Sequence, residues 1–418
     1  MKRAALGTIA TRVAIAAAQL LVAALAARLL GLAEVGRMSL LVLAITFVML
    51  AINIVSGGAL VYLEPRHGTR TLRRIAYGWA LLVSAIAAFV LEPIGLAPEN
   101  LGVHAATLAL LEAVGSIHLT LLLGRERFGH HNAMMLGRGL VLLASFIALL
   151  RIDGPAFEDY LYALYAAHGF TAIGSALLLA RLPGVHSDGT AAFLAMLRHG
   201  FPAQLANGLQ LLNYRLSYYL VQRFQGASAL GLWAVTTQLA ESAWLAPKSL
   251  GTVLYARMSN SDEAVRQREL TLTVLKASVL IAATATLLLL LLPETVFIWV
   301  FGPEAIGIRR LVLLLAPGLL AMAASQALSH YLSGTGKVQH NTIASGLALI
   351  VTLAAGFTLI PDHGANGAAI AASAAYSTAL FYQAIVFNRL TGSRPLHYLP
   401  DAHDLNRLLA LLRMLKRG

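Results

Sequence analysis

The sequence predicts an all-α polytopic membrane protein with about twelve transmembrane helices, arranged as two parallel-repeat six-helix lobes around a central cavity. Hydrophobic residues make up 58% of the 418 residues and charged residues only 12%, against about 25% charged residues in an ordinary soluble domain. Apolar runs of about 20 residues, long enough to cross the hydrocarbon layer of a bilayer, recur from end to end. A faint internal repeat divides these runs into two sets. We therefore expect no separate soluble domain.

The predicted spans are separated by clusters of proline and glycine, which end helices and reverse the direction of the chain. Examples are the pairs at 154–155, 183–184 and 302–303 and the segment 361–364. The first run is too long for the apolar part of a cleaved signal peptide, so we expect it to be retained as a span. The predicted spans are 8–30, 36–63, 74–92, 101–123, 132–151, 158–180, 202–223, 229–256, 270–292, 307–332, 340–360 and 366–388.

The charged residues between the spans predict the topology. An even number of spans places both termini on one side of the membrane. Lysine and arginine gather on that side, and cytoplasmic loops are the ones enriched in basic residues. Both termini are therefore predicted to be cytoplasmic. The basic set includes Lys2, Arg3, Arg66, Arg70, Arg73, Arg74, Arg125, Arg127, Arg181 and Arg198, and the opposite side carries Glu99, Asp153, Glu158, Asp159 and Asp362.

The internal repeat predicts the domain organisation. The segment 31–36 (GLAEVG) opens the second span and 226–231 (GASALG) opens the eighth, while the far ends of these spans are similar at 58–62 (GALVY) and 251–255 (GTVLY). An offset of six spans leaves both copies in the same orientation, as in transporters built from repeats with a substrate path between them. The alternative is chance recurrence of small residues. The predicted parts are an N-terminal lobe at 1–180, a cytoplasmic linker with a short amphipathic helix at 181–199, a C-terminal lobe at 200–390 and a basic cytoplasmic tail at 391–418.

Several functional classes find no support in the sequence. The net charge of +12 could suggest nucleic acid, but basic patches interleaved with aromatic residues are absent, so no nucleic-acid partner is expected. The chain has no cysteine, which excludes thiolate metal sites and cysteine nucleophiles. Phosphate-binding loops and zinc-protease motifs are also missing. We expect neither an enzyme, nor a cofactor, nor a bound metal.

The candidate substrate-binding residues are concentrated in the seventh and eighth spans. A charged side chain in the middle of the bilayer costs about 2.5 to 3.5 kcal/mol on insertion scales, so each one is a candidate for function. At about 100° per residue, the polar side chains of each span fall on one face. A structural ion pair between Arg215 and Glu241 is the alternative interpretation. The candidates here are Gln204, Asn207, Tyr214, Arg215, Tyr218, Glu241 and Lys248.

The first lobe offers fewer candidates. Arg12 in the first span and Asn53 in the second complete the predicted substrate-binding set, although an arginine near a span end can also extend to the headgroups. Glu112, Arg138 and His168 are further polar groups within predicted spans. We expect Arg138 to extend to the membrane surface and His168 to be an interhelical hydrogen-bond partner. Trp233 and Trp299 are expected to be interfacial anchors.

Several short segments resemble the polysaccharide-transporter branch of the multidrug and oligosaccharidyl-lipid flippase superfamily, the O-antigen type of lipid-linked oligosaccharide flippase. The segment 27–31 (ARLLG) with Glu34 and Gly36 is similar to the first outer loop of this family. The seventh span carries the likeness at 201–204 (FPAQ) and 213–215 (NYR), and the eighth at Glu241, Trp244 and Pro247. The likeness continues at 331–334 (YLSG), Gly336, Lys337, 360–361 (IP), Gly364 and Gly367.

The resemblance implies transfer of an undecaprenyl-diphosphate-linked oligosaccharide from the cytoplasmic to the outer leaflet of a bacterial inner membrane, for lipopolysaccharide or exopolysaccharide biosynthesis. It implies membrane lipids and polysaccharide polymerase machinery as partners. A diphosphate needs cationic donors, which Arg215, Lys248 and Arg12 could supply. The family often carries an acidic residue two positions after the arginine, where this chain has Ser217. Arg215 is therefore expected either to pair with Glu241 or to be free for substrate.

Three alternatives stay open at this point. A cation-coupled drug or small-molecule exporter on the same fold often uses an acidic residue in the first span, and this first span has none. A major-facilitator transporter would carry a Gly/Asp/Arg signature where this chain has 65–74 (PRHGTRTLRR). A membrane polysaccharide polymerase or ligase would be expected to have a large outer loop. The sequence does not rank Glu112, Glu241 and His168 as carriers of a coupling proton.

Overall fold

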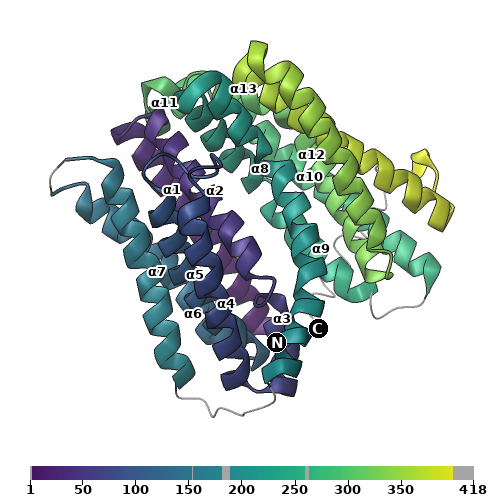
Figure 1. Ribbon diagram of the computed structural model, residues 1–418. Helices are drawn as coiled ribbons and strands as arrows, with labels where there is room; N and C mark the ends of the chain where they lie inside the picture. Colours follow the sequence, from purple (N-terminus) through teal and green to yellow (C-terminus); the bar gives the residue numbers. More distant parts are fainter. Residues whose placement is uncertain (1, 153, 181–188, 259–262, 399–418) are drawn as a thin grey trace. The chain divides into compact units, whose positions relative to one another are not determined.

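The computed structural model describes residues 2–152, 154–180, 189–258 and 263–398 (Figure 1). Within these ranges the chain is helical, with turns and two short 3-10 helices and no strand. The helices are α1 (Lys2–Leu29), α2 (Leu32–Ile52), α3 (Gly58–His67), α4 (Thr69–Val90), α5 (Gly102–Gly124), α6 (Phe128–Leu149), α7 (Phe157–Ala180), α8 (Gly189–Ser242), α9 (Leu245–Met258), α10 (Ala264–Leu291), α11 (Glu294–Phe301), η1 (Pro303–Ala305), α12 (Ile308–Gly334), α13 (Gln339–Thr391) and η2 (Pro395–Tyr398).

The length and composition of the helices confirm a polytopic all-α membrane protein. Among the described residues, 9 helices are long and apolar enough to cross a membrane. One of these, α13, has non-helical torsion angles at Gly364 and consists of two segments; α8 is divided in the same way at Gly226. The segments of α8 occupy the places of the seventh and eighth predicted spans. Polar residues around Arg215 explain why α8 is not among the apolar helices.

Contacts divide the chain into two compact units, one covering Arg3–Gly208 and the other beginning at Leu209. We call them the first and the second unit. In the first unit, α4, α5, α6 and α7 run side by side, with α5 in contact with each of the other three (Figure 1). In the second unit, α12 contacts α9, α10 and α13. The unit boundary lies within α8, and the lobe boundaries given above stay predictions.

Small residues let helices approach closely in the second unit. Ala344 and Ala348 on one segment of α13 form a buried cluster with Ala375 and Ala379 on the other segment. At Gly318 in α12, an added Cβ would lie 2.6 Å from the Cα of Ser373. Close backbone approach between small residues is the usual source of packing energy in a membrane, where apolar burial does not favour helix association over lipid.

Two predicted spans are shorter than expected. The second, predicted as 36–63, ends at Ile52, and a turn at 53–57 separates α2 from α3. Gly57 has φ +56°, a backbone conformation that glycine adopts without a steric penalty. The eighth, predicted as 229–256, is interrupted at 243–244. The ring of Pro247 would clash with the carbonyl group four residues earlier in an unbroken helix, which explains this break.

The predicted amphipathic stretch 191–198 is helical but is not a separate helix. It belongs to α8, which begins at Gly189 and continues into the seventh predicted span. Gly200 lies against the turn after α2, where an added Cβ would meet the carbonyl oxygen of Ile54 at 2.0 Å. This close approach fixes the start of α8 within the first unit.

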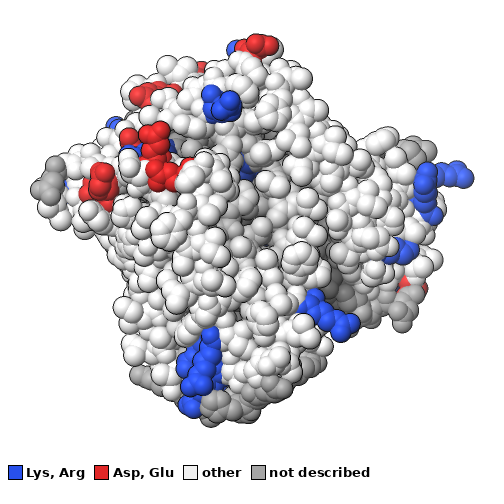
Figure 2. Space-filling model, viewed as in Figure 1, with Lys and Arg blue, Asp and Glu red and all other residues white. Residues whose placement is uncertain are grey.

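Charged side chains are sparse on the face shown in Figure 2, most of which is covered by uncharged residues. Acidic groups gather over the upper end of the first unit, near the connection between α6 and α7, and basic groups lie at its lower end (Figures 1 and 2). The surface between these ends presents uncharged side chains, as expected for a helix bundle in lipid.

Candidate functional site

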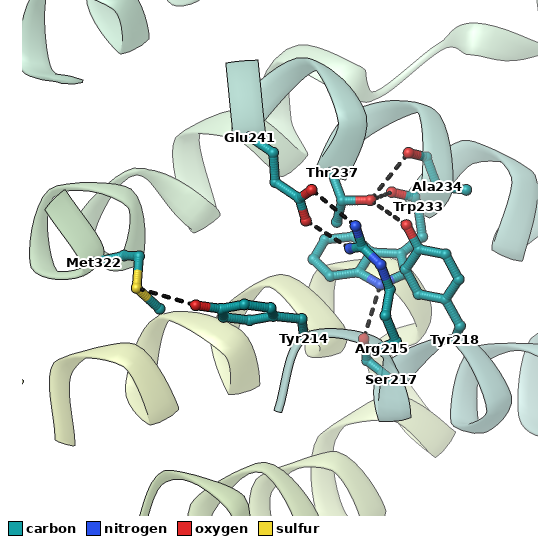
Figure 3. A network of polar contacts seen from close by, with 9 residues as sticks. All are labelled: Tyr214, Arg215, Ser217, Tyr218, Trp233, Ala234, Thr237, Glu241 and Met322. Carbon is teal, nitrogen blue, oxygen red and sulfur yellow. Dashed lines mark hydrogen bonds and ion pairs between the residues drawn. The ribbon is translucent and has the colours of Figure 1, made fainter. Parts of the chain in front are cut away.

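The second unit contains an ion pair between the two segments of α8. The Arg215 Nη1 and Nη2 atoms lie 2.6 Å and 2.8 Å from the Glu241 Oε1 and Oε2 atoms (Figure 3). This two-fold contact matches the planar guanidinium to the carboxylate. Gly226, with φ +84° and ψ −177°, reverses the chain between the segments, so residues 26 positions apart face each other. The pairing of Arg215 with Glu241, one of two alternatives that the sequence left open, is therefore present.

The Tyr218 side chain lies beside this ion pair and is hydrogen-bonded to the other segment of α8 through Thr237. The Tyr218 ring lies beside the guanidinium, with the Arg215 Cζ atom 5.1 Å from the ring centroid. The Tyr218 hydroxyl is 2.6 Å from the Thr237 Oγ1 atom. Thr237 itself lies within hydrogen-bond distance of the Trp233 and Ala234 carbonyl oxygens, so its hydroxyl donates to the backbone and accepts from Tyr218 (Figure 3).

Trp233 is not the interfacial anchor that the sequence suggested. Its side chain is only 1% exposed, and its Nε1 atom donates to the Ser217 Oγ atom at 3.0 Å. Ser217 thus accepts a neutral hydrogen bond from the indole. A buried indole needs such an acceptor for its N–H group, so Trp233 and Ser217 join the two segments of α8 beside the ion pair.

Three aromatic rings from α8 and α13 and the turn after α8 lie next to the ion pair. Tyr214 and Tyr376 meet edge to face at 5.7 Å between ring centroids, and Trp244 lies 5.8 Å from Tyr376 and 6.1 Å from Tyr214. The Tyr214 hydroxyl contacts the Met322 sulfur atom (Figure 3). Rings arranged in this way offer flat apolar faces together with hydroxyl groups, a combination suited to a sugar or an aromatic ligand.

The pair retains binding capacity. Glu241 engages two of the five N–H donors of a guanidinium, and the side chains of Arg215 and Glu241 are 25% and 28% exposed. An anion could therefore reach the remaining donors, or replace the carboxylate. Breaking a partly buried pair would strand the carboxylate unless another group compensates it. The site is suited to exchange of one anionic partner for another.

Lys248 lies in α9 on an exposed surface. Its charge acts on His330 of α12. Its predicted role in substrate binding stays a prediction.

The remaining predicted residues lie in the first unit. The Asn207 Nδ2 atom donates to the Gln204 Oε1 atom at 3.3 Å, with Gln204 buried and Asn207 exposed. Arg12 is exposed on α1. Asn53 follows the last residue of α2, and its Oδ1 atom accepts a hydrogen bond from Ser56 at 3.1 Å. Asn53 therefore helps to terminate α2, which the sequence analysis did not anticipate.

Sequence reasoning missed Tyr376 and Thr237. Tyr376 is the one aromatic residue in the alanine-rich stretch 368–379, a signal that could have marked it. Thr237 is one hydroxyl among many in the chain, and nothing in its sequence context distinguishes it. Only the facing segment of α8 gives Thr237 its role.

Comparison with known proteins concerns the fold. No protein-family model matches the chain, and no curated protein matches it. A multidrug resistance MATE family transporter of the MOP superfamily, in an inward-facing conformation, is similar with a TM-score of 0.71 and 12% identity, over 94% of this chain and 96% of that chain. The lipid II flippase MurJ, in an inward closed conformation, is similar with a TM-score of 0.69 and 13% identity, over 99% of this chain and 97% of that chain.

The chain has the fold of these transporters. A Vibrio cholerae MATE transporter, VcmN, is similar with a TM-score of 0.63 and 14% identity, over 95% of this chain and 97% of that chain. All three are described as transporters or as a flippase. At these identities the likeness concerns the fold, and the substrate has to be argued from the site.

Proposed function

We propose that this protein is a flippase that moves a polyprenyl-diphosphate-linked oligosaccharide from the cytoplasmic to the outer leaflet of a bacterial inner membrane. The observation that carries the proposal is the Arg215–Glu241 pair beside the Tyr214, Trp244 and Tyr376 rings. A guanidinium is the side chain best suited to a diphosphate, because its forked donors bind two oxygens at once. Aromatic faces and hydroxyl groups suit the sugars, while the polyprenyl chain would stay in the bilayer.

The fold supports transport of a lipid-linked substrate. One solved structure with this fold, over nearly the whole chain, is a flippase of lipid II. The proposed substrate is likewise a lipid joined to a polar group. Its anionic diphosphate linkage would explain the Arg215 guanidinium in a helix that is predicted to cross the membrane. We further propose polysaccharide biosynthesis as the pathway.

A drug exporter is the second candidate. The MATE transporters that share the fold include one described as a multidrug resistance transporter, and the three aromatic rings would also accommodate a flat apolar cation beside Glu241. The two candidates differ in the charge that the site selects. An oligosaccharide diphosphate needs Arg215, whereas a cationic drug needs Glu241.

Reconstitution in vesicles tests the proposal. Proteoliposomes with the full-length chain would be loaded with a polyprenyl-diphosphate oligosaccharide, and an impermeant lectin or glycosidase would report the fraction that reaches the outer leaflet. We expect transfer with the protein and none in empty vesicles. Equal transfer in both kinds of vesicle would contradict the flippase proposal. Efflux of a cationic dye from the same vesicles, without oligosaccharide transfer, would instead favour the exporter.

A further inference from the structure

A second polar site lies within the first unit, between α5, α6 and α7. It is a cavity with a volume of about 230 Å³. That volume has room for several water molecules, since a water occupies about 30 Å³ in the liquid. Polar groups dominate its wall, which is unusual for a gap between membrane helices. The lining residues are Glu112, Ser116, Leu119, Thr120, His131, Met135, Arg138, His168 and Thr171.

An ion pair crosses this cavity. The Arg138 Nη1 atom lies 3.0 Å from the Glu112 Oε1 atom, so Arg138 does not simply extend to the membrane surface as the sequence suggested. The side chains are 25% and 26% exposed. In the second unit both oxygens of Glu241 are held by Arg215. Within the described residues, Arg138 contacts one carboxylate oxygen of Glu112, and the other is available for a proton.

A histidine in the wall of the same cavity has a buried ring nitrogen without a partner. His168 is 7% exposed, and its Nδ1 atom has no hydrogen-bond partner among the described residues. A buried imidazole nitrogen left without a partner is costly. The charges of both Glu112 and Arg138 act on the His168 ring. His168 therefore lies within the electrostatic reach of the pair.

His118, on the same helix as Glu112, provides the contrast. The Ser175 hydroxyl donates to the Thr171 carbonyl oxygen at 2.6 Å, so its oxygen accepts from the His118 Nδ1–H group at 2.9 Å. The His118 Nε2 atom then accepts from the Tyr77 hydroxyl. Both nitrogens of the neutral His118 ring therefore have hydrogen-bond partners, and neither is left open to bind a further proton.

We propose that the cavity between α5, α6 and α7 is a proton-binding site, in which Glu112 and His168 share one proton and Arg138 is the fixed countercharge. Binding adds one H⁺ from water to the pair and breaks no covalent bond. The charged and titratable groups that face the site are Glu112 on α5, His131 and Arg138 on α6 and His168 on α7. Arg12 of α1 acts on His131.

Proton binding would change the balance of the ion pair. With Glu112 ionised, the carboxylate and Arg138 neutralise each other; one added proton leaves a net positive charge in a low-dielectric site, which favours rearrangement of the three helices. If the protein is a transporter as proposed above, this step supplies a coupling ion. Only that coupling rests on the proposed function, and the proton site itself does not.

Proton uptake by the purified full-length protein, measured without oligosaccharide, tests the site. The protein would be titrated from about pH 8 to about pH 5, the range in which histidine and coupled carboxyl groups exchange protons. We expect Glu112→Gln and His168→Gln each to lower the uptake by about one proton per chain, and the double variant to lower it by about one rather than two, because the groups share the proton.

Matched variants serve as controls. His118→Gln should leave the uptake unchanged, since both nitrogens of the His118 ring have hydrogen-bond partners. Glu112→Asp keeps a carboxyl group and should retain the uptake, which separates loss of the proton from loss of folding. Unchanged uptake in both Glu112→Gln and His168→Gln, or a loss of two protons in the double variant, would overturn the shared site. Either result leaves the vesicle test of oligosaccharide transfer unaffected.

Discussion

Arg215 is the residue on which the proposed function depends most. It lies about 13 residues into the seventh predicted span, about 20 Å along the helix at 1.5 Å per residue, so the predicted span places its charge within the hydrocarbon layer. The structure gives it an anionic partner, Glu241, in a two-fold contact. This geometry is compatible with two roles. The pair is either a structural ion pair, or an anion-binding site that the Glu241 carboxylate occupies while no substrate is bound.

The first prediction separates these roles by charge and shape. We expect Arg215→Ala to lower oligosaccharide transfer by about tenfold or more, because one charge-assisted hydrogen bond is worth about 1.5 to 3 kcal/mol. Arg215→Lys keeps the positive charge but loses the planar group that donates to two oxygens at once, so we expect it to retain partial transfer. Initial rates in proteoliposomes with equal protein content are the measurement. Full oligosaccharide transfer by a well-folded Arg215→Ala protein would show that Arg215 does not bind the substrate.

The second prediction uses the partner. If Arg215 binds substrate, combining Arg215→Ala with Glu241→Ala should leave transfer as low as in Arg215→Ala alone. If the pair is only a scaffold, the double variant should recover folding and transfer together, because neither charge is then stranded. Detergent-solubilised yield and thermal stability, measured on the same preparations, report folding. Recovery of transfer would assign Arg215 to the scaffold.

At the scale of the helices, two glycine breaks in the second unit shape the surroundings of the site. Gly226 divides α8 and Gly364 divides α13. Gln225 lies between them, and its Nε2 atom donates to the Pro361 carbonyl oxygen at 2.8 Å and to the Ile360 carbonyl oxygen at 3.2 Å. The side chain thus ties the turn of one helix pair to the turn of the other.

The third prediction concerns Gly226. Its φ of +84° with ψ of −177° falls in a region that is essentially restricted to glycine, so Gly226→Ala should cost about 1 to 3 kcal/mol. Gly346 in α13 is helical, and an added Cβ there meets nothing within 4 Å. Gly346→Ala should therefore be neutral or stabilising. The melting temperature in detergent measures both; equal melting temperatures would contradict the role assigned to the break.

The fourth prediction concerns the packing of α12 on α13. An added Cβ at Gly318 would lie 2.6 Å from the Ser373 Cα and 2.9 Å from the Ser373 Oγ atom, and backbone cannot move aside as a flexible side chain can. Gly318→Ala should destabilise the protein by about 1 to 3 kcal/mol through overpacking. The same Gly346→Ala variant is the control. An unchanged melting temperature in Gly318→Ala would show that the helices separate without cost.

At the scale of the whole molecule, topology is the property to test. Basic residues predominate in the loops predicted to be cytoplasmic, and on the first unit acidic and basic side chains gather at opposite ends on the face shown in Figure 2. The fifth prediction is that reporter fusions at Gly154 and Pro361 indicate the outer side and that a fusion at His186 indicates the cytoplasm. A cytoplasmic signal at Gly154 or Pro361 would contradict the topology of about twelve spans.

Sequence alone determined the class of this protein and most of its helices and marked Arg215 as a candidate, because hydrophobicity, helix length and the cost of a buried charge are local properties. It could not determine where α2 ends, because the turn at 53–57 depends on close contacts with other helices such as the approach of Gly200 to Ile54. These contacts involve residues far apart in the chain.

Tertiary structure decided which polar groups meet. Periodicity places Arg215, Glu241, Glu112 and His168 on polar faces but leaves the rotation and axial height of each helix undefined. Rotation and axial height decide that Arg215 contacts both oxygens of Glu241 and that Arg138 contacts one oxygen of Glu112. They also bury the His168 Nδ1 atom in a residue that lines the same cavity as Glu112. Polar contacts depend on distances of a few tenths of an ångström, whereas the hydrophobic pattern that builds the spans tolerates shifts of a whole turn.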